Sequence, residues 1–88
     1  MRNISLKITF KLFASLTEFL PDDAENNIAE IIANREDSVH DLIDRFRVPR
    51  ESVHLILVNG IYIVPADRDK PILKEGDVLA MWPPVAGG

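Results

Sequence analysis

The sequence predicts a single α+β domain in which a mixed sheet of about five strands carries one main helix on one face. Three observations predict it. The first dozen residues alternate between apolar and polar side chains, as a half-buried strand does. One central segment has the apolar spacing of a single amphipathic helix. Short apolar segments separated by turn residues follow that helix.

The first half of the chain supplies two strands. Apolar and polar residues alternate over residues 4–12, which predicts a half-buried strand. Residues 13–20 break the alternation with a spacing that suits a short helical turn, and Pro21 stops it. Residues 27–33 form a second candidate strand. We expect it to pair with the first as a hairpin, with residues 13–26 as a long connection.

The main helix is expected just after these strands. Its apolar positions recur at intervals of three and four residues, and they form one face. They are Val39, Leu42, Ile43 and Phe46. Ser38 is the expected N-cap, and Asp41, three residues later, completes an approximate capping box. Pro49 is expected to end the helix.

Two strands joined by a tight turn follow the helix. Residues 53–58 are apolar on both faces, which favours a central strand. Asn59-Gly60 is a dipeptide that two-residue hairpin turns prefer, because both residues tolerate positive φ. Residues 61–64 are then expected to return as a short strand.

A long polar connection precedes the last strand. Residues 65–77 are rich in polar and turn residues, and Leu73 is their one expected core residue. Residues 74–77 supply a turn. Residues 78–82 form the last strand, which the double proline Pro83-Pro84 ends.

The predicted order of elements is two strands, one helix and three strands. A crossing helix between strands of one mixed sheet is the β-grasp arrangement. We therefore expect a β-grasp domain over residues 1–82, followed by an extended and flexible tail over residues 83–88. No internal repeat, linker or low-complexity segment is visible, so a second domain is not expected.

The composition narrows the functional classes. The 88 residues include no cysteine, which excludes disulfides, thiolate metal ligands and a cysteine nucleophile. The net charge is −4 and the basic residues are scattered, so no nucleic-acid partner is expected. No stretch suits a signal peptide or a membrane span, so a cytoplasmic protein without a membrane partner is expected.

Conventional catalytic and metal-binding groups are sparse. His40 and His54 are the only histidines, and they would bind a metal only if the fold brought acidic ligands to them. We interpret them as ordinary histidines. No serine has the motif of a nucleophile, and the four glycines form no phosphate-binding loop. We expect no metal, no stably bound cofactor and no catalysis by the chain alone.

The C-terminal segment is the exception. Pro83-Pro84 fixes φ and disfavours helix, so the chain is expected to leave the last strand extended. Val85 and Ala86 are small, and Gly87-Gly88 has no side chains. Six such residues form a thread that reaches at most ~20 Å. The carboxylate of Gly88 at its tip is the expected reactive group.

A thin thread suits chemistry on its terminal carboxylate. Coupling to AMP would convert the unreactive carboxylate into a mixed anhydride, which is a good acyl donor. Glycine would let the tip pass through a narrow channel of the activating enzyme, where a Cβ would obstruct it. Sulfide could then replace the acyl phosphate and give a thiocarboxylate, an anionic nucleophile. A frayed tail without function is the plain alternative.

Four segments match the pattern of a known family. They are Leu12-Phe13-Ala14-Ser15-Leu16, Val58-Asn59-Gly60, Leu73-Lys74-Glu75-Gly76-Asp77 and the ending Trp82-Pro83-Pro84-Val85-Ala86-Gly87-Gly88. On these residues the sequence resembles the MoaD/ThiS family of ubiquitin-like sulfur carriers. The ending is the most specific segment, because it is similar to the aromatic-Pro-Pro-Val-Ala/Thr-Gly-Gly close of the MoaD branch. The resemblance covers nearly the whole chain and implies a ubiquitin-like β-grasp fold.

The resemblance implies the small subunit of molybdopterin synthase. An E1-like adenylyltransferase would activate Gly88 with ATP, and a sulfur donor protein would convert it to a thiocarboxylate. The tail would then enter the synthase large subunit, in a heterotetramer, and pass sulfur to a pyranopterin precursor of the molybdenum or tungsten cofactor. Gly87 would give clearance in this pocket. The linker threaded into the partner would be Pro83, Pro84, Val85 and Ala86.

Trp82 stands where the family usually has phenylalanine. Alternation on the last strand places Met81 and Trp82 on opposite faces, one inward and one outward. An exposed aromatic residue beside the tail would suit an interface anchor.

Three alternative functions stay open. A ThiS-type carrier for thiamine thiazole synthesis, or for another pathway, would use the same chemistry, although that branch usually has a shorter chain without the double proline. A ubiquitin-like protein modifier would also activate its terminal glycine, but would join it to lysines. A non-covalent binding module would not need the tail.

Overall fold

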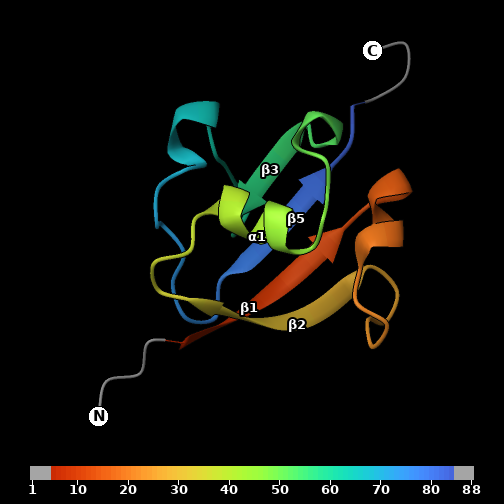
Figure 1. The fold of residues 1–88 in the computed structure, drawn as a ribbon, viewed down its shortest axis with the longest axis horizontal. Helices are drawn as coiled ribbons and strands as arrows, with labels where there is room; N and C mark the ends of the chain where they lie inside the picture. Colours follow the sequence, from red (N-terminus) through yellow and green to blue (C-terminus); the bar gives the residue numbers. More distant parts are fainter. Residues whose placement is uncertain (1–4, 85–88) are drawn as a thin grey trace.

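The computed structural model describes residues 5–84, and its order of elements is the predicted one (Figure 1). The strands are β1 (Ser5–Leu12), β2 (Ile28–Asn34), β3 (Leu55–Val58), β4 (Ile61–Tyr62) and β5 (Val78–Trp82). The α-helix is α1 (Val39–Arg45), and the 3-10 helices are η1 (Ala14–Phe19), η2 (Arg50–Ser52) and η3 (Pro65–Asp67). Ile4, expected in the first strand, lies outside the described residues.

The strands form one mixed sheet in the order β2-β1-β5-β3-β4. β1 pairs antiparallel with β2 and parallel with β5, and β5 pairs antiparallel with β3. Helix α1 lies across one face of this sheet (Figure 1). The predicted mixed sheet with one helix on one face is therefore confirmed.

The central strand is β5, and the prediction that residues 53–58 form it was wrong. β3 is second from the edge, between β5 and the two-residue strand β4. Leu55 and Leu57 are only half-buried, whereas Ile56 and Val58 are buried in the core beneath α1. Apolar residues on both faces of β3 thus reflect an apolar open face of the sheet, not burial on both sides.

The core fills the space between the sheet and α1. The predicted alternation holds along β1, where every second side chain is buried against the helix. The largest fully buried side chain is Phe10, which stacks on Phe46 with a ring-centroid distance of 4.9 Å. Leu73 is buried, as predicted for the long connection. Helix α1 contributes its predicted face, although Phe46 is only partly buried because it caps the end of the helix.

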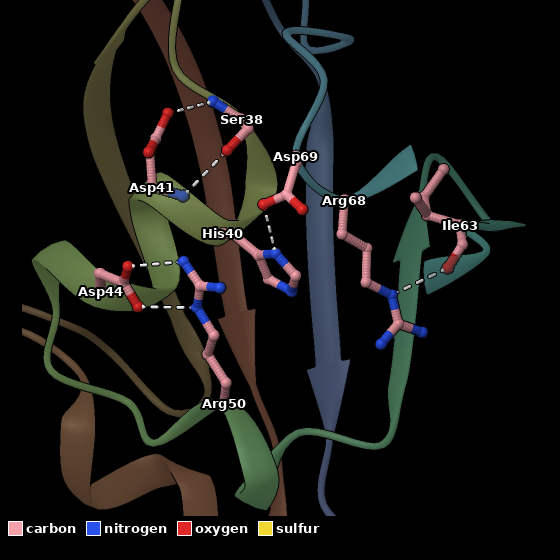
Figure 2. A network of polar contacts seen from close by, with 8 residues as sticks. All are labelled: Ser38, His40, Asp41, Asp44, Arg50, Ile63, Arg68 and Asp69. Carbon is pink, nitrogen blue, oxygen red and sulfur yellow. Dashed lines mark hydrogen bonds and ion pairs between the residues drawn. The ribbon is translucent and has the colours of Figure 1, made fainter. Parts of the chain in front are cut away.

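The capping box at the start of α1 is confirmed (Figure 2). The Ser38 hydroxyl accepts from the Asp41 N–H at 3.0 Å, and the Asp41 carboxylate accepts from the Ser38 N–H at 2.9 Å. The helix ends earlier than predicted, at Arg45 rather than at Pro49. Arg47 has a φ of +62°, and the Val48 N–H donates to the carbonyl of Ile43. This left-handed turn closes the helix before the proline is reached.

Replacement of Ser38 by alanine is expected to lower the free energy of unfolding by about 1 kcal/mol, because it removes the N-cap acceptor. Ser38 is also 4% exposed, so water cannot easily replace the hydroxyl. Urea denaturation measures the loss. The exposed Ser15→Ala variant is the matched control, and an equal effect of both substitutions would contradict the capping role.

Four strand boundaries differ from the prediction. β2 extends one residue further, to Asn34, and β3 begins at Leu55 rather than Val53, whose N–H donates to the carbonyl of Arg50 at the end of η2.

Asn27, expected at the start of the second strand, instead uses its side-chain amide to donate to the carbonyl of Leu12 at 2.9 Å. The strand expected over residues 61–64 ends at Tyr62. The next carbonyl that faces β3, that of Ile63, accepts from the Arg68 Nε at 3.1 Å instead of from the strand.

Candidate functional site: the base of the tail

The chain leaves the sheet from the end of its central strand. β5 ends at Trp82, between its neighbours β1 and β3 (Figure 1). Pro83 is half-buried and Pro84 is exposed, and neither belongs to a strand, in agreement with the predicted stop. The other predicted site residues lie outside the described residues, and their roles stay predictions. They are Val85, Ala86, Gly87 and Gly88.

Trp82 has an aromatic partner that the sequence did not identify. The rings of Phe13 and Trp82 are parallel to within 4°, with centroids 4.4 Å apart. The Phe13 N–H also donates to the carbonyl of Met81 at 3.2 Å. Stacked aromatic pairs add about 0.5–1.5 kcal/mol beyond their buried area. The pair therefore holds the base of the tail against the end of β1.

An unusual backbone conformation positions Phe13 for this contact. Ala14 has a φ of +53°, which non-glycine residues rarely adopt. It turns the chain from the end of β1 into η1 and leaves Phe13 beside the end of β5. The one signal available in the sequence was the break in alternation at Phe13, within a segment that matches the family pattern.

Trp82 lies on the face of the sheet opposite to α1. Met81 is fully buried in the core, whereas Trp82 is half-buried and lies beside Leu55 of β3 on the other face. As expected, Met81 and Trp82 lie on opposite faces of the sheet. The next row of this open face pairs Ala80 with Leu57 and with Lys11. Half-buried apolar side chains, with Lys11 next to them, thus lie directly beside the end of β5.

Two other segments of the family pattern meet at the opposite end of β5. The Asn59 amide donates to the Asp77 carboxylate at 2.9 Å and accepts from the Val78 N–H at 2.9 Å. The Asp77 carboxylate also accepts from the Lys74 N–H at 2.8 Å. Asn59 and Gly60 both have positive φ, as the predicted hairpin turn requires. These segments fix where β5 begins, which is a structural role.

The two histidines lie in different surroundings. His40 contacts Asp69 with an Nδ1–Oδ1 distance of 2.7 Å, next to a two-point ion pair between Arg50 and Asp44 (Figure 2). The hydrogen bond from Arg50 lowers the pKa of Asp44. His54 is exposed on the approach to β3. Within residues 5–84, no group of three His, Cys, Asp or Glu side chains is arranged to hold a metal.

A family model places the chain among known proteins. The model of Mut7-C ubiquitin matches residues 5–86, which include both prolines of the tail base. The chain belongs to this family. The Mut7-C ubiquitin name agrees with the ubiquitin-like β-grasp fold described above. No curated protein matches the chain. None of the helices described in residues 5–84 is long and apolar enough to cross a membrane.

Three solved structures are similar to this chain. The HVO 2177 protein of Haloferax volcanii is 20% identical with a TM-score of 0.72, over 100% of this chain and 92% of the other. A candidate molybdopterin converting factor, subunit 1, from Pyrococcus furiosus is 28% identical with a TM-score of 0.65, over 91% and 99%. Small archaeal modifier protein 1 of Methanosarcina acetivorans is 24% identical with a TM-score of 0.61, over 96% and 98%. These results confirm the MoaD/ThiS-like, ubiquitin-like character predicted from the sequence.

Proposed function

We propose that this protein is a sulfur carrier that works through the carboxylate of Gly88. The supporting observation is the base of the tail, where the central strand ends at Trp82 and the chain leaves through two prolines beside Phe13. A rigid domain that releases its chain at this point can present a thread to another protein. In this proposal the partner binds the folded domain, and the chemistry on the tail occurs in the partner's active site.

The reaction has two steps, both in partners of the chain. A Gly88 carboxylate oxygen attacks the α-phosphorus of ATP in an E1-like adenylyltransferase, and pyrophosphate leaves. A sulfide nucleophile provided by a sulfur donor protein then attacks the carbonyl carbon, and AMP leaves to give the thiocarboxylate. ATP belongs to the activating partner, so the carrier itself needs no bound cofactor. Gly87 supplies the clearance that this passage needs.

The proposed destination of the sulfur is a pyranopterin precursor of the molybdenum or tungsten cofactor. The sequence Trp82-Pro83-Pro84 at the tail base supports this branch, as does the similarity to the molybdopterin converting factor subunit. The tail would enter the large subunit of the synthase in a heterotetramer, with Pro83 to Ala86 as the threaded linker. Trp82 would contact the same partner through the open sheet face, where it lies beside Leu55.

Intact-mass spectrometry tests the proposal. The purified chain is incubated with an E1-like adenylyltransferase, ATP and a sulfide source, and the expected result is a mass gain equal to the exchange of one oxygen for one sulfur. Omission of ATP is the control and should leave the mass unchanged. The proposal fails if the mass does not change with the full mixture. A Gly-Gly remnant on lysines of other proteins, without the sulfur adduct, would instead identify a protein modifier.

A further inference from the structure

The two edges of the sheet differ in how far the chain itself closes them. At the β2 edge, Glu25 and Ile28 exchange two backbone hydrogen bonds, each of 3.0 Å. The Arg45 guanidinium donates to the carbonyl of Ile32 at 2.7 Å. The Asn34 N–H donates to the Asp37 carboxylate. Asp37 in turn donates its N–H to the carbonyl of Asn34, so the chain bonds both ends of this edge and leaves unpaired, in its middle, the backbone groups of Glu30 and the N–H of Ile32.

The β4 edge is open and apolar. The Ile63 N–H donates to the carbonyl of Ile56, and Val58 pairs with Ile61 across the tight turn. Because backbone groups alternate in direction along a strand, the N–H and C=O of Tyr62 face away from the sheet. The exposed fractions are 69% for Ile61, 48% for Tyr62 and 44% for Val64. This edge presents one residue of unpaired backbone between large apolar side chains.

A buried arginine lies beside this edge. Arg68 is 8% exposed, and its Nε donates to the carbonyl of Ile63 at 3.1 Å (Figure 2). Its Nη2 lies 3.5 Å from the carbonyl of His54 and 3.5 Å from the Tyr62 hydroxyl. The guanidinium thus takes the place beside β3 that a longer β4 would fill. This explains why β4 contains only two residues.

The positive charge of Arg68 has no carboxylate partner within residues 5–84. Its Nη1 makes no hydrogen bond there, and every buried side-chain nitrogen in that part of the chain has a partner. Nη1 therefore reaches solvent from a guanidinium that backbone carbonyls hold in a fixed orientation. A guanidinium fixed in this way is suited to bind a carboxylate, because little side-chain entropy remains to be lost.

We propose that the β4 edge is a docking site for an extended segment of a partner protein that carries an Asp or Glu side chain. The backbone of the segment would pair with Tyr62, its apolar side chains would contact Ile61 and Val64, and its carboxylate would bind Arg68. A second copy of the chain fits less well. Antiparallel self-pairing about Tyr62 would bring two like charges toward each other, because each Arg68 lies beside its own Tyr62 and forms no ion pair within residues 5–84. The site does not involve the tail, so it is independent of the proposed function.

A peptide titration followed by ¹⁵N–¹H NMR tests this site on the full chain. The probes are the peptide acetyl-Thr-Val-Glu-Val-Thr-amide and its matched version with Gln in place of Glu. We expect saturable shifts of the Ile61, Tyr62 and Ile63 amide signals, with tighter binding of the Glu peptide. Ile61→Gln should weaken binding about tenfold, because apolar contact is lost. Ile32→Gln, at an exposed apolar residue of the opposite β2 edge that is 52% exposed in the wild-type chain, is the matched control.

Arg68→Gln should remove the preference for the Glu peptide. If the substitution of the buried Arg68 prevents folding, the Ile61→Gln variant still tests the site. Equal binding of the two peptides by the wild-type chain would overturn the proposal. So would shifts at β2, or no shifts at all. Concentration-dependent shifts of β4 without peptide would identify a second copy as the occupant instead. Shifts of the β4 amide signals on removal of residues 85–88 would identify the chain's own tail as the occupant. Each of these last two results would also overturn the proposal.

Discussion

Deletion of Gly88 is expected to abolish sulfur loading while the domain keeps its stability. The deletion retracts the terminal carboxylate by one residue, or about 3.3 Å. Misplacement of a reacting group by about 1 Å already costs about 10²-fold in rate, so loading should fall below detection. The fold should be unaffected, because the described core and sheet end at Trp82. Intact-mass spectrometry after the loading reaction measures the first effect, and thermal melting measures the second.

Two substitutions that leave the tail at its full length distinguish the effect of tail length from the effect of side-chain size. Gly87→Val keeps the reach of the tail but adds a branched side chain next to the tip, so it should also block loading. Ala86→Gly keeps both the length and the narrowness of the tail, and it should load sulfur like the wild-type chain. Normal loading of the chain that lacks Gly88 would contradict the assignment of that residue as the sulfur acceptor. Failure of the Ala86→Gly control would show that the linker has a further role.

Replacement of Phe10 by alanine is expected to have the largest effect on stability. Its ring is fully buried between the sheet and α1, and it stacks on Phe46. Removal of a buried phenylalanine ring costs about 3–5 kcal/mol, through lost burial and the cavity that it leaves. Domains of this kind are stable by about 5–15 kcal/mol, so the variant should be strongly destabilised. Urea denaturation at 25 °C measures the difference in free energy of unfolding.

Phe46→Ala is the matched control for this prediction. It removes the other ring of the same stacked pair, but from the half-buried end of α1. The loss should be about half that of Phe10→Ala, because part of the Phe46 ring already contacts water. Equal losses in both variants would contradict the burial difference and would show that the stack itself, rather than the cavity, sets the cost.

Local patterns predicted the elements of the fold well. The alternation in β1 and the spacing of Val39, Leu42 and Ile43 in α1 each follow from a period that the backbone geometry imposes. The capping box of Ser38 and the hairpin turn at Asn59-Gly60 depend on residues that are neighbours in sequence. For such features the chain carries all the necessary information within a few positions.

Long-range contacts were not predictable in the same way. The sequence marked the end of β5 as the base of a tail, but not that Phe13 stacks on Trp82 across 69 positions. The residues of β3 are apolar on both faces, as in a central strand, but one of these faces belongs to the open side of the sheet. Nothing in the sequence indicated that Arg68 would end β4 by binding the carbonyl of Ile63. Each of these results depends on which strands become neighbours.

The amino-acid sequence by itself determined the β-grasp order of elements and the caps and turns. These follow from short-range sterics and from the periods of helix and strand. Only the tertiary structure decided that β5 lies at the centre, that Phe13 supports Trp82, and that Arg68 lies beside the β4 edge. Strand pairing joins residues far apart in sequence, and its register depends on how the whole core packs.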